Sequence, residues 1–268
     1  HANMSISNVD AIAVTYAPGL MGSLLVGLEF AKTLSLVYDK PLIKTHHIAG
    51  HIYANNLVKP IKFPSLALVV SGGHTELVVM KDEYTFNLLG ATLDDAIGEA
   101  FDKVARVLGL PYPGGPEIDK LAKMGENKYN FVVSKSLKNT LNFSFSGIKT
   151  EIVNLVHNAS QKGQELVKED VACSFQEAVT EELVTKAIRA CKQENIDTLV
   201  IAGGVGANSR LNEKAKTYCE KESITCYSPI LKYCTDNSAM IGCMAYYMIK
   251  DGLGLADLDL SVKPNIDL

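Results

Sequence analysis

Hydrophobic positions along the chain alternate between short β-branched runs and longer stretches of helical periodicity. Short apolar runs bounded by turn residues predict buried strands at residues 9–14, 41–44, 66–70, 76–80, 198–202 and 224–227. Helices are predicted at residues 22–38, from about 46, at 94–108, 146–157 and 167–194, from about 209, and at 237–249. This alternation of strand and helix is typical of an α/β fold.

The composition is that of an ordinary globular protein, with 47% hydrophobic and 21% charged residues among 268. No apolar run reaches the roughly 18 to 20 residues that cross a bilayer, and Glu29 and Lys32 interrupt the longest one. We therefore expect no membrane span and no signal peptide. Six cysteines without a C-x-x-C pair indicate reduced thiols and a cytoplasmic protein.

The net charge of −4 argues against a protein that coats nucleic acid without specificity. One local stretch is basic: residues 120–149 hold six lysines and one acid, a balance of +5. This stretch is a candidate RNA-binding surface, and a solvated lysine-rich face is the alternative.

Two histidines, His47 and His51, lie four residues apart in a segment of helical character. Their rings therefore project from one helix face, where one metal ion can accept a nitrogen from each. A zinc hydrolase of the H-E-x-x-H kind needs a carboxylate beside the first histidine, and none is present between them. Asp236 would complete a facial triad, with the metal between two halves of the molecule; the alternative role of Asp236 is the N-cap of the last helix.

Two glycine-rich turns, at residues 71–75 and 203–208, each follow a buried strand. Glycine lets backbone N–H groups approach a phosphate closely, and the second turn also presents the start of a helix. Two such turns in separate halves of the chain would fit a nucleotide held in an interdomain cleft. Neither matches the P-loop pattern.

Three carboxylates, Asp95, Glu99 and Asp102, are predicted on one helix face. In one interpretation, Glu99 pairs with Lys103 and Asp102 pairs with Arg106, each at i,i+4. In the other, Asp102 faces a ligand and accepts hydrogen bonds from the hydroxyl groups of that ligand.

Taken together, these segments resemble the TsaD family, also called Gcp or YgjD. The matching stretches follow one another in family order at residues 13–24, 46–51, 70–75, 94–103, 112–116, 143–149, 203–208 and 235–237. The resemblance implies an actin-like (ASKHA) two-lobed α/β fold whose N-terminal lobe is incomplete. Residues 1–62 would be the rest of that lobe, with the metal-binding helix. Residues 63–268 would form the C-terminal lobe, with a helical insertion at about 92–195.

The resemblance also implies transfer of the threonylcarbamoyl group from threonylcarbamoyl-AMP to N6 of adenosine 37, just 3′ of the anticodon, in tRNAs reading codons that begin with A. Carried over by position, His47, His51 and Asp236 would hold one divalent metal, Fe²⁺ or Zn²⁺. The adenine nucleotide would contact Val69, Val70, Ser71, Gly72, Gly73, Asp102, Gly115, Asp119 and Asn208. No residue is assigned as a catalytic nucleophile, acid or base.

Two departures from the family pattern stand out. Ala49 replaces the glutamate that members often carry between the metal histidines, and the strand that opens the family's first lobe is absent before residue 1. An unpaired sheet edge would then favour self-association. The implied partners are tRNA, a TsaB-like paralogue and a TsaE-like ATPase. The alternatives are a nucleotide-binding scaffold without activity and, less consistent with the missing glutamate, a metallopeptidase.

Overall fold

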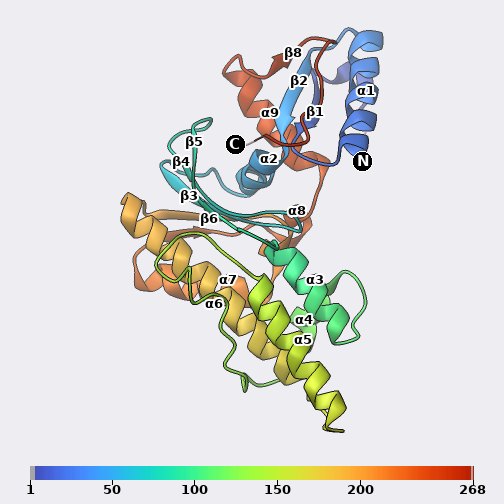
Figure 1. The fold of residues 1–268 in the computed structure, drawn as a ribbon. Helices are drawn as coiled ribbons and strands as arrows, with labels where there is room; N and C mark the ends of the chain where they lie inside the picture. Colours follow the sequence, from blue (N-terminus) through green and yellow to red (C-terminus); the bar gives the residue numbers. More distant parts are fainter. Residues whose placement is uncertain (1–3, 267) are drawn as a thin grey trace. The chain divides into compact units, whose positions relative to one another are not determined.

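The chain divides into two compact units in the computed structural model, which describes residues 4–266 and 268 (Figure 1). The first unit comprises His1–Pro60 and Thr235–Leu268, and the second comprises Ile61–Cys234. The boundary near residue 60 lies close to the expected one at 62/63. Residues 235–268 differ from expectation, because they belong to the first unit instead of the second.

The first unit is built on a three-stranded sheet of order β1-β2-β8, which Figure 1 shows between α1 and α9. Its β2 pairs in parallel with β1 and antiparallel with β8, and this last pairing draws the C-terminal segment into the unit. Helix α9 packs against α2, η2 and β2. The elements are η1 (Ile6–Asn8), β1 (Ile12–Ala17), α1 (Met21–Tyr38), β2 (Leu42–His46), α2 (His47–Tyr53), η2 (Ala54–Leu57), α9 (Ser238–Lys250) and β8 (Leu255–Ala256).

Helix α1 is apolar on more than one face. Leu24, Leu28 and Ala31 are buried, whereas Val26 and Phe30 are 74% and 66% exposed. Within the described chain, α1 alone is long and apolar enough to cross a membrane, although 22% of it is buried. The sequence predicted no membrane-spanning helix, and this candidate differs from that prediction. A single such helix near the N-terminus is weak evidence for one, because core helices and signal sequences pass the same test.

The second unit has a five-stranded sheet of order β5-β4-β3-β6-β7, and helices α3–α7 gather on one side of it (Figure 1). The central strand β3 is buried at all six positions and pairs antiparallel with β4 and parallel with β6. The strands are β3 (Ser65–Val70), β4 (Thr75–Met80), β5 (Phe86–Ala91), β6 (Thr198–Ala202) and β7 (Thr225–Tyr227). The helices are α3 (Ile97–Val107), α4 (Gly114–Ala122), α5 (Ser146–Gln161), α6 (Lys168–Glu194), η3 (Gly204–Ala207), α7 (Ser209–Lys221) and α8 (Leu231–Cys234).

Helix α6 runs through the core of this unit and carries a buried cation. Lys186 is 1% exposed, and its ammonium group donates to the Asn142 carbonyl and pairs with Glu182 at 2.7 Å. The same ammonium lies 5.1 Å from the centroid of the Phe143 ring. These contacts hold the 142–143 segment against α6.

Several elements differ from the sequence prediction. Strands β5 and β8 and helices α4 and α8 were not predicted, and α3 begins at Ile97 instead of residue 94. Asp94 lies outside α3 because it accepts hydrogen bonds at the start of α5, from the backbone N–H of Phe145 (2.8 Å) and from the Ser146 hydroxyl (2.7 Å). All six cysteines are free, as predicted.

Candidate metal centre and nucleotide-binding turns

Two imidazoles and one carboxylate converge within the first unit. His47 opens α2 and His51 follows one turn later, so that the ring centroids are 4.8 Å apart. The Asp236 carboxylate places Oδ1 3.1 Å from Nε2 of His51 and 3.5 Å from Nε2 of His47. The structure therefore brings together the three residues that the sequence predicted as metal ligands.

Local packing explains how Asp236 reaches the two histidines. Asn237, not Asp236, is the N-cap of α9: its Oδ1 accepts from the Met240 N–H at 2.9 Å. The cap alternative for Asp236 is thus wrong. Gly50 lets α2 approach α9 closely, because a Cβ there would lie 2.8 Å from Cδ1 of Ile241. We expected the metal site to lie between two halves of the molecule. This prediction is wrong, because all three candidate ligands belong to the first unit.

The electrostatics of this cluster suit a metal ligand set. The pKa of Asp236 lies below its ordinary value, because the hydrogen bond from His51 lowers it more than partial desolvation raises it. The carboxylate is therefore ionised at neutral pH.

The donor atoms also fit a divalent metal. One ligand atom from each residue lies within 4.8 Å of the others, and two imidazole nitrogens with one carboxylate oxygen suit Fe, Zn or Mn. His51 is 2% exposed and its Nδ1 has no hydrogen-bond partner, which leaves only its Nε2 side engaged. The Asp236 side chain is 78% exposed, so the cluster is open on one side.

The two glycine turns lie side by side in the second unit, not in separate halves. They follow β3 and β6, which are neighbouring parallel strands, so both turns lie at the carboxyl ends of strands where α/β folds bind ligands. The turns are in close contact: a Cβ at Gly203 would lie 2.4 Å from the Val70 carbonyl oxygen. Gly98, at the start of α3, contacts the first of these turns, because its backbone N–H donates to the Ser71 carbonyl oxygen at 3.2 Å.

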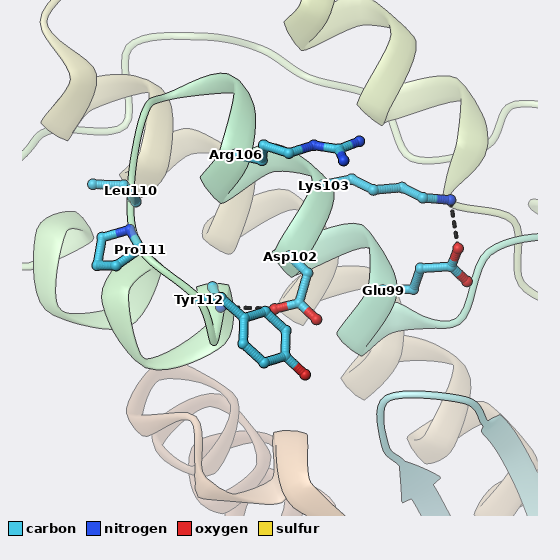
Figure 2. Close-up of a pocket in the computed structure, with 8 residues that line it drawn as sticks. Glu99, Asp102, Lys103, Arg106, Leu110, Pro111 and Tyr112 are labelled. Atoms are coloured by element: carbon cyan, nitrogen blue, oxygen red, sulfur yellow. Dashed lines mark hydrogen bonds and ion pairs between the residues drawn. The ribbon is translucent and has the colours of Figure 1, made fainter.

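The other residues that we expected to contact the nucleotide lie around the starts of α4 and α7. Asp102 does not pair with Arg106; its Oδ1 accepts from the Gly114 N–H at 2.7 Å, next to Gly115 (Figure 2). Asp119 on α4 accepts from the Ser209 hydroxyl at 2.7 Å, which ties α4 to α7.

Asn208 caps α7, since its Oδ1 accepts from the Leu211 N–H at 2.9 Å. Its amide nitrogen donates to Oε1 of Gln176 at 2.8 Å. Sequence reasoning missed Ser209, although it follows Asn208 directly, and Gln176, which no local pattern distinguishes within α6. Val69 and Val70 are fully buried in β3, so their side chains belong to the core.

The predicted carboxylate face is only partly formed. Glu99 pairs with Lys103 at 2.6 Å, as predicted, and Asp95 lies before α3, 2.8 Å from the Lys103 ammonium and 3.0 Å from that of Lys149. The pKa of Asp95 lies below its ordinary value, chiefly because of the hydrogen bond from Lys103.

Three of the six lysines in the basic stretch are engaged in ion pairs. Lys123 pairs with Asp119, Lys128 with Asp170 and Lys149 with Asp95. The free positive charge of residues 120–149 is thereby concentrated on Lys120, Lys135 and Lys138.

Comparison with solved structures defines the class of fold. The chain is similar to full-length HypF in a phosphate- and nucleotide-bound form, with a TM-score of 0.64 at 15% identity, over 86% of this chain and 38% of that one. A second similar structure is HypF of T. kodakarensis, with a TM-score of 0.64 at 14% identity, over 96% of this chain and 43% of that one. Together with the strand order and the paired glycine turns, this likeness confirms the predicted actin-like α/β fold.

Comparison at the sequence level is more specific. The model of the family described as TsaD, tRNA N6-adenosine threonylcarbamoyltransferase, matches residues 1–243. Relatives with that name in Staphylococcus haemolyticus and Staphylococcus epidermidis are 53% and 52% identical, over 100% of this chain and 78% of theirs. The chain belongs to the TsaD family, as its motifs predicted.

Proposed function

We propose that this chain transfers the threonylcarbamoyl group from threonylcarbamoyl-AMP to N6 of the adenosine 3′ of the anticodon in tRNA. The observation that carries the proposal is identity of 53% over the whole chain to a protein named tRNA N6-adenosine threonylcarbamoyltransferase. The names of the relatives favour this transferase over a scaffold or a metallopeptidase. We place the reaction in the cytoplasm.

The transfer breaks one bond and forms one. N6 of the adenine attacks the carbamoyl carbon, the bond from that carbon to the phosphate oxygen breaks, and AMP leaves with the bonding electrons. The proton on N6 is lost to solvent. No covalent enzyme intermediate is needed, which agrees with the absence of an assigned nucleophile.

His47, His51 and Asp236 would hold one divalent metal, Fe²⁺ or Zn²⁺. When bound, such an ion supplies Lewis-acid polarisation of carbamoyl and phosphate oxygens. The ionised Asp236 and the converging imidazoles supply the ligands, and the exposed side of Asp236 leaves room for substrate oxygens.

The second unit would bind the adenylate. Backbone N–H groups of Gly72 and Gly73 can donate to the phosphate, whereas the Ser71 N–H is engaged with the His74 carbonyl oxygen at 2.9 Å and Ser71 would meet the ligand through other atoms. Asp102 commits Oδ1 to Gly114, and its other carboxylate oxygen has no partner among the described residues, so it can accept a ribose hydroxyl. Gly115, Asp119 and Asn208 would complete this site.

The exposed face of α1 would dock a TsaB-like paralogue. Val26, Phe30 and Val37 recur on one face at helical spacing and are each at least 66% exposed, opposite the buried Leu24 and Leu28. A helix that is apolar all round is normally covered on all sides. Loss of paralogue binding in Phe30→Asp, with an unchanged circular dichroism spectrum, would support this assignment. A TsaE-like ATPase would complete the assembly.

A reconstituted transfer assay tests the proposal. The chain is mixed with threonylcarbamoyl-AMP, tRNA and both partner proteins, and modified adenosine is measured by mass spectrometry of nucleosides. We expect His47→Ala to lose bound metal and transfer activity. His157→Ala is the matched control, because His157 is exposed on α5 of the second unit, whereas the cluster belongs to the first. Adenylate binding by the wild-type chain without any transfer would contradict the proposal and favour the scaffold alternative.

A further inference from the structure

The segment that follows β8 stays in contact with the first unit although it has no regular secondary structure. We call residues 260–266 of this segment the C-terminal strap. Leu260 and Val262 pack against the apolar cluster that β1, α1 and β2 form. The family model ends at residue 243, so the strap lies outside the family match.

Backbone hydrogen bonds fix the strap at the end of β1. The register of β1 on β2 skips Tyr16, which is the extra residue of a β-bulge. The Tyr16 carbonyl oxygen accepts from the Lys263 N–H at 2.9 Å instead, and the Pro264 carbonyl oxygen accepts from the Gly19 N–H at 3.0 Å. The strap is therefore held on both sides of the turn that leads from β1 to α1.

His46 joins the end of the strap to α2. It is the N-cap of that helix, since its Nδ1 accepts from the Ala49 N–H at 3.4 Å. Its Nε2 lies 3.4 Å from the Ile266 carbonyl oxygen. Because Nδ1 is an acceptor, the neutral ring carries its proton on Nε2, which donates to Ile266. The two contacts thus require the same tautomer of one ring.

The start of α2 determines where the candidate metal ligands lie. His47 directly follows the cap and His51 lies one turn later, and their Nε2 atoms are 3.5 and 3.1 Å from the Asp236 carboxylate. Helix α2 has only seven residues, so its first N–H groups depend on partners outside the helix. We propose that His46 is a positioning residue of this cluster and that the C-terminal strap holds its ring in place. This inference rests on the metal ligand set of the proposed function.

Co²⁺ binding by the full chain tests the inference without any transfer reaction. The ion is titrated into the metal-free chain, and its visible absorption gives the affinity. Lys263→Pro removes the N–H that bonds to Tyr16, and Lys263→Ala keeps it and is the matched control, because the Lys263 side chain is exposed. Loss of one hydrogen bond predicts that Lys263→Pro weakens Co²⁺ binding about 2- to 10-fold. Lys263→Ala should bind as tightly as the wild type.

Variants of His46 show whether this residue connects the strap to the cluster. His46→Asn retains a good helix cap but is too short to reach the Ile266 carbonyl oxygen. Its Co²⁺ affinity should fall by about the same factor as in Lys263→Pro, and adding Lys263→Pro to it should cause no further loss. His46→Ala removes the cap as well, so it should bind Co²⁺ less tightly than His46→Asn and show faster amide exchange in the first turn of α2.

Wild-type Co²⁺ affinity in Lys263→Pro and His46→Asn would overturn the inference, as would equal losses in Lys263→Pro and Lys263→Ala or additive losses in the double variant. Urea unfolding followed by circular dichroism shows whether each variant is folded. If Lys263→Pro does not fold, unchanged Co²⁺ affinity in His46→Asn still overturns the inference. The expected Co²⁺ affinities in a chain that transfers nothing would contradict the proposed transfer alone, whereas a wild-type chain that binds no Co²⁺ would contradict the metal ligand set and this inference together.

Discussion

Replacing Gly203 by alanine should disrupt the junction of the two glycine turns. Gly203 has a φ of +92°, a region that side-chain-bearing residues rarely adopt, and an added Cβ would lie 2.4 Å from the carbonyl oxygen and 2.8 Å from the carbonyl carbon of Val70. Both clashing atoms are backbone, so they cannot rotate away. Backbone strain of about 1 to 3 kcal/mol and overpacking of about 1 to 3 kcal/mol together predict a loss of about 2 to 6 kcal/mol in the free energy of unfolding.

Gly72→Ala is the matched control, because no atom lies within 4 Å of a Cβ at that position. Its free energy of unfolding should change by less than about 1 kcal/mol. The chain has no tryptophan, so unfolding in urea is followed by far-UV circular dichroism, with amide hydrogen exchange to resolve β3 and β6. Equal stability of the Gly203→Ala variant and the wild type would refute the close-approach reasoning, as would equal losses in both variants.

Three further predictions concern charged groups of the second unit. The pKa of Asp94 lies below its ordinary value because hydrogen bonds from Ser144 and Ser146 outweigh desolvation, which raises it. Asp94→Asn should therefore lower the stability by about 1 kcal/mol at pH 7, and in urea titrations this difference should begin to shrink below about pH 4 and disappear only when the pH has fallen below the lowered pKa of the folded carboxyl. Lys186→Ala should cost about 3 to 5 kcal/mol, because it leaves partners of a buried cation unpaired, whereas the exposed Lys192→Ala should cost less than about 1 kcal/mol in the same urea titration. The Lys135→Glu, Lys138→Glu double variant should weaken tRNA binding and its salt dependence in filter-binding assays; unchanged values would assign these lysines to a solvated face.

Much of the fold follows from local sequence patterns. Buried β-branched runs predicted β3, β4 and β6 to within one residue, and helical periodicity predicted α1, α6 and α9 equally closely. Strand β5 escaped prediction because its residues are mostly exposed or half-buried and show no clear alternation. Helix α4 escaped because it begins with Gly114 and Gly115, which are weak helix formers.

The candidate metal site shows a similar limit. His47 and His51 follow from helical spacing alone, whereas Asp236 is distant in sequence and looked like a helix cap. Only the structure shows that Asn237 takes the cap and leaves the Asp236 carboxylate free. The hydrogen bond from the Gly114 N–H to Asp102 was equally hidden, since no periodicity places that loop beside α3, and both a pair with Arg106 and a ligand-facing carboxylate remained open for Asp102.

The discontinuity of the first unit sets an order for biosynthesis. The candidate metal cluster joins His51 to Asp236, which follows 185 residues later in the chain. At about 5 to 20 residues per second, a ribosome adds Asp236 roughly 10 to 40 seconds after His51. The contiguous second unit is complete before that moment, whereas the first unit still lacks α9, β8 and its carboxylate ligand. Completion of the candidate metal centre is therefore a late event, and a nascent chain that has already folded its sheet of five strands still lacks one of the three candidate ligands.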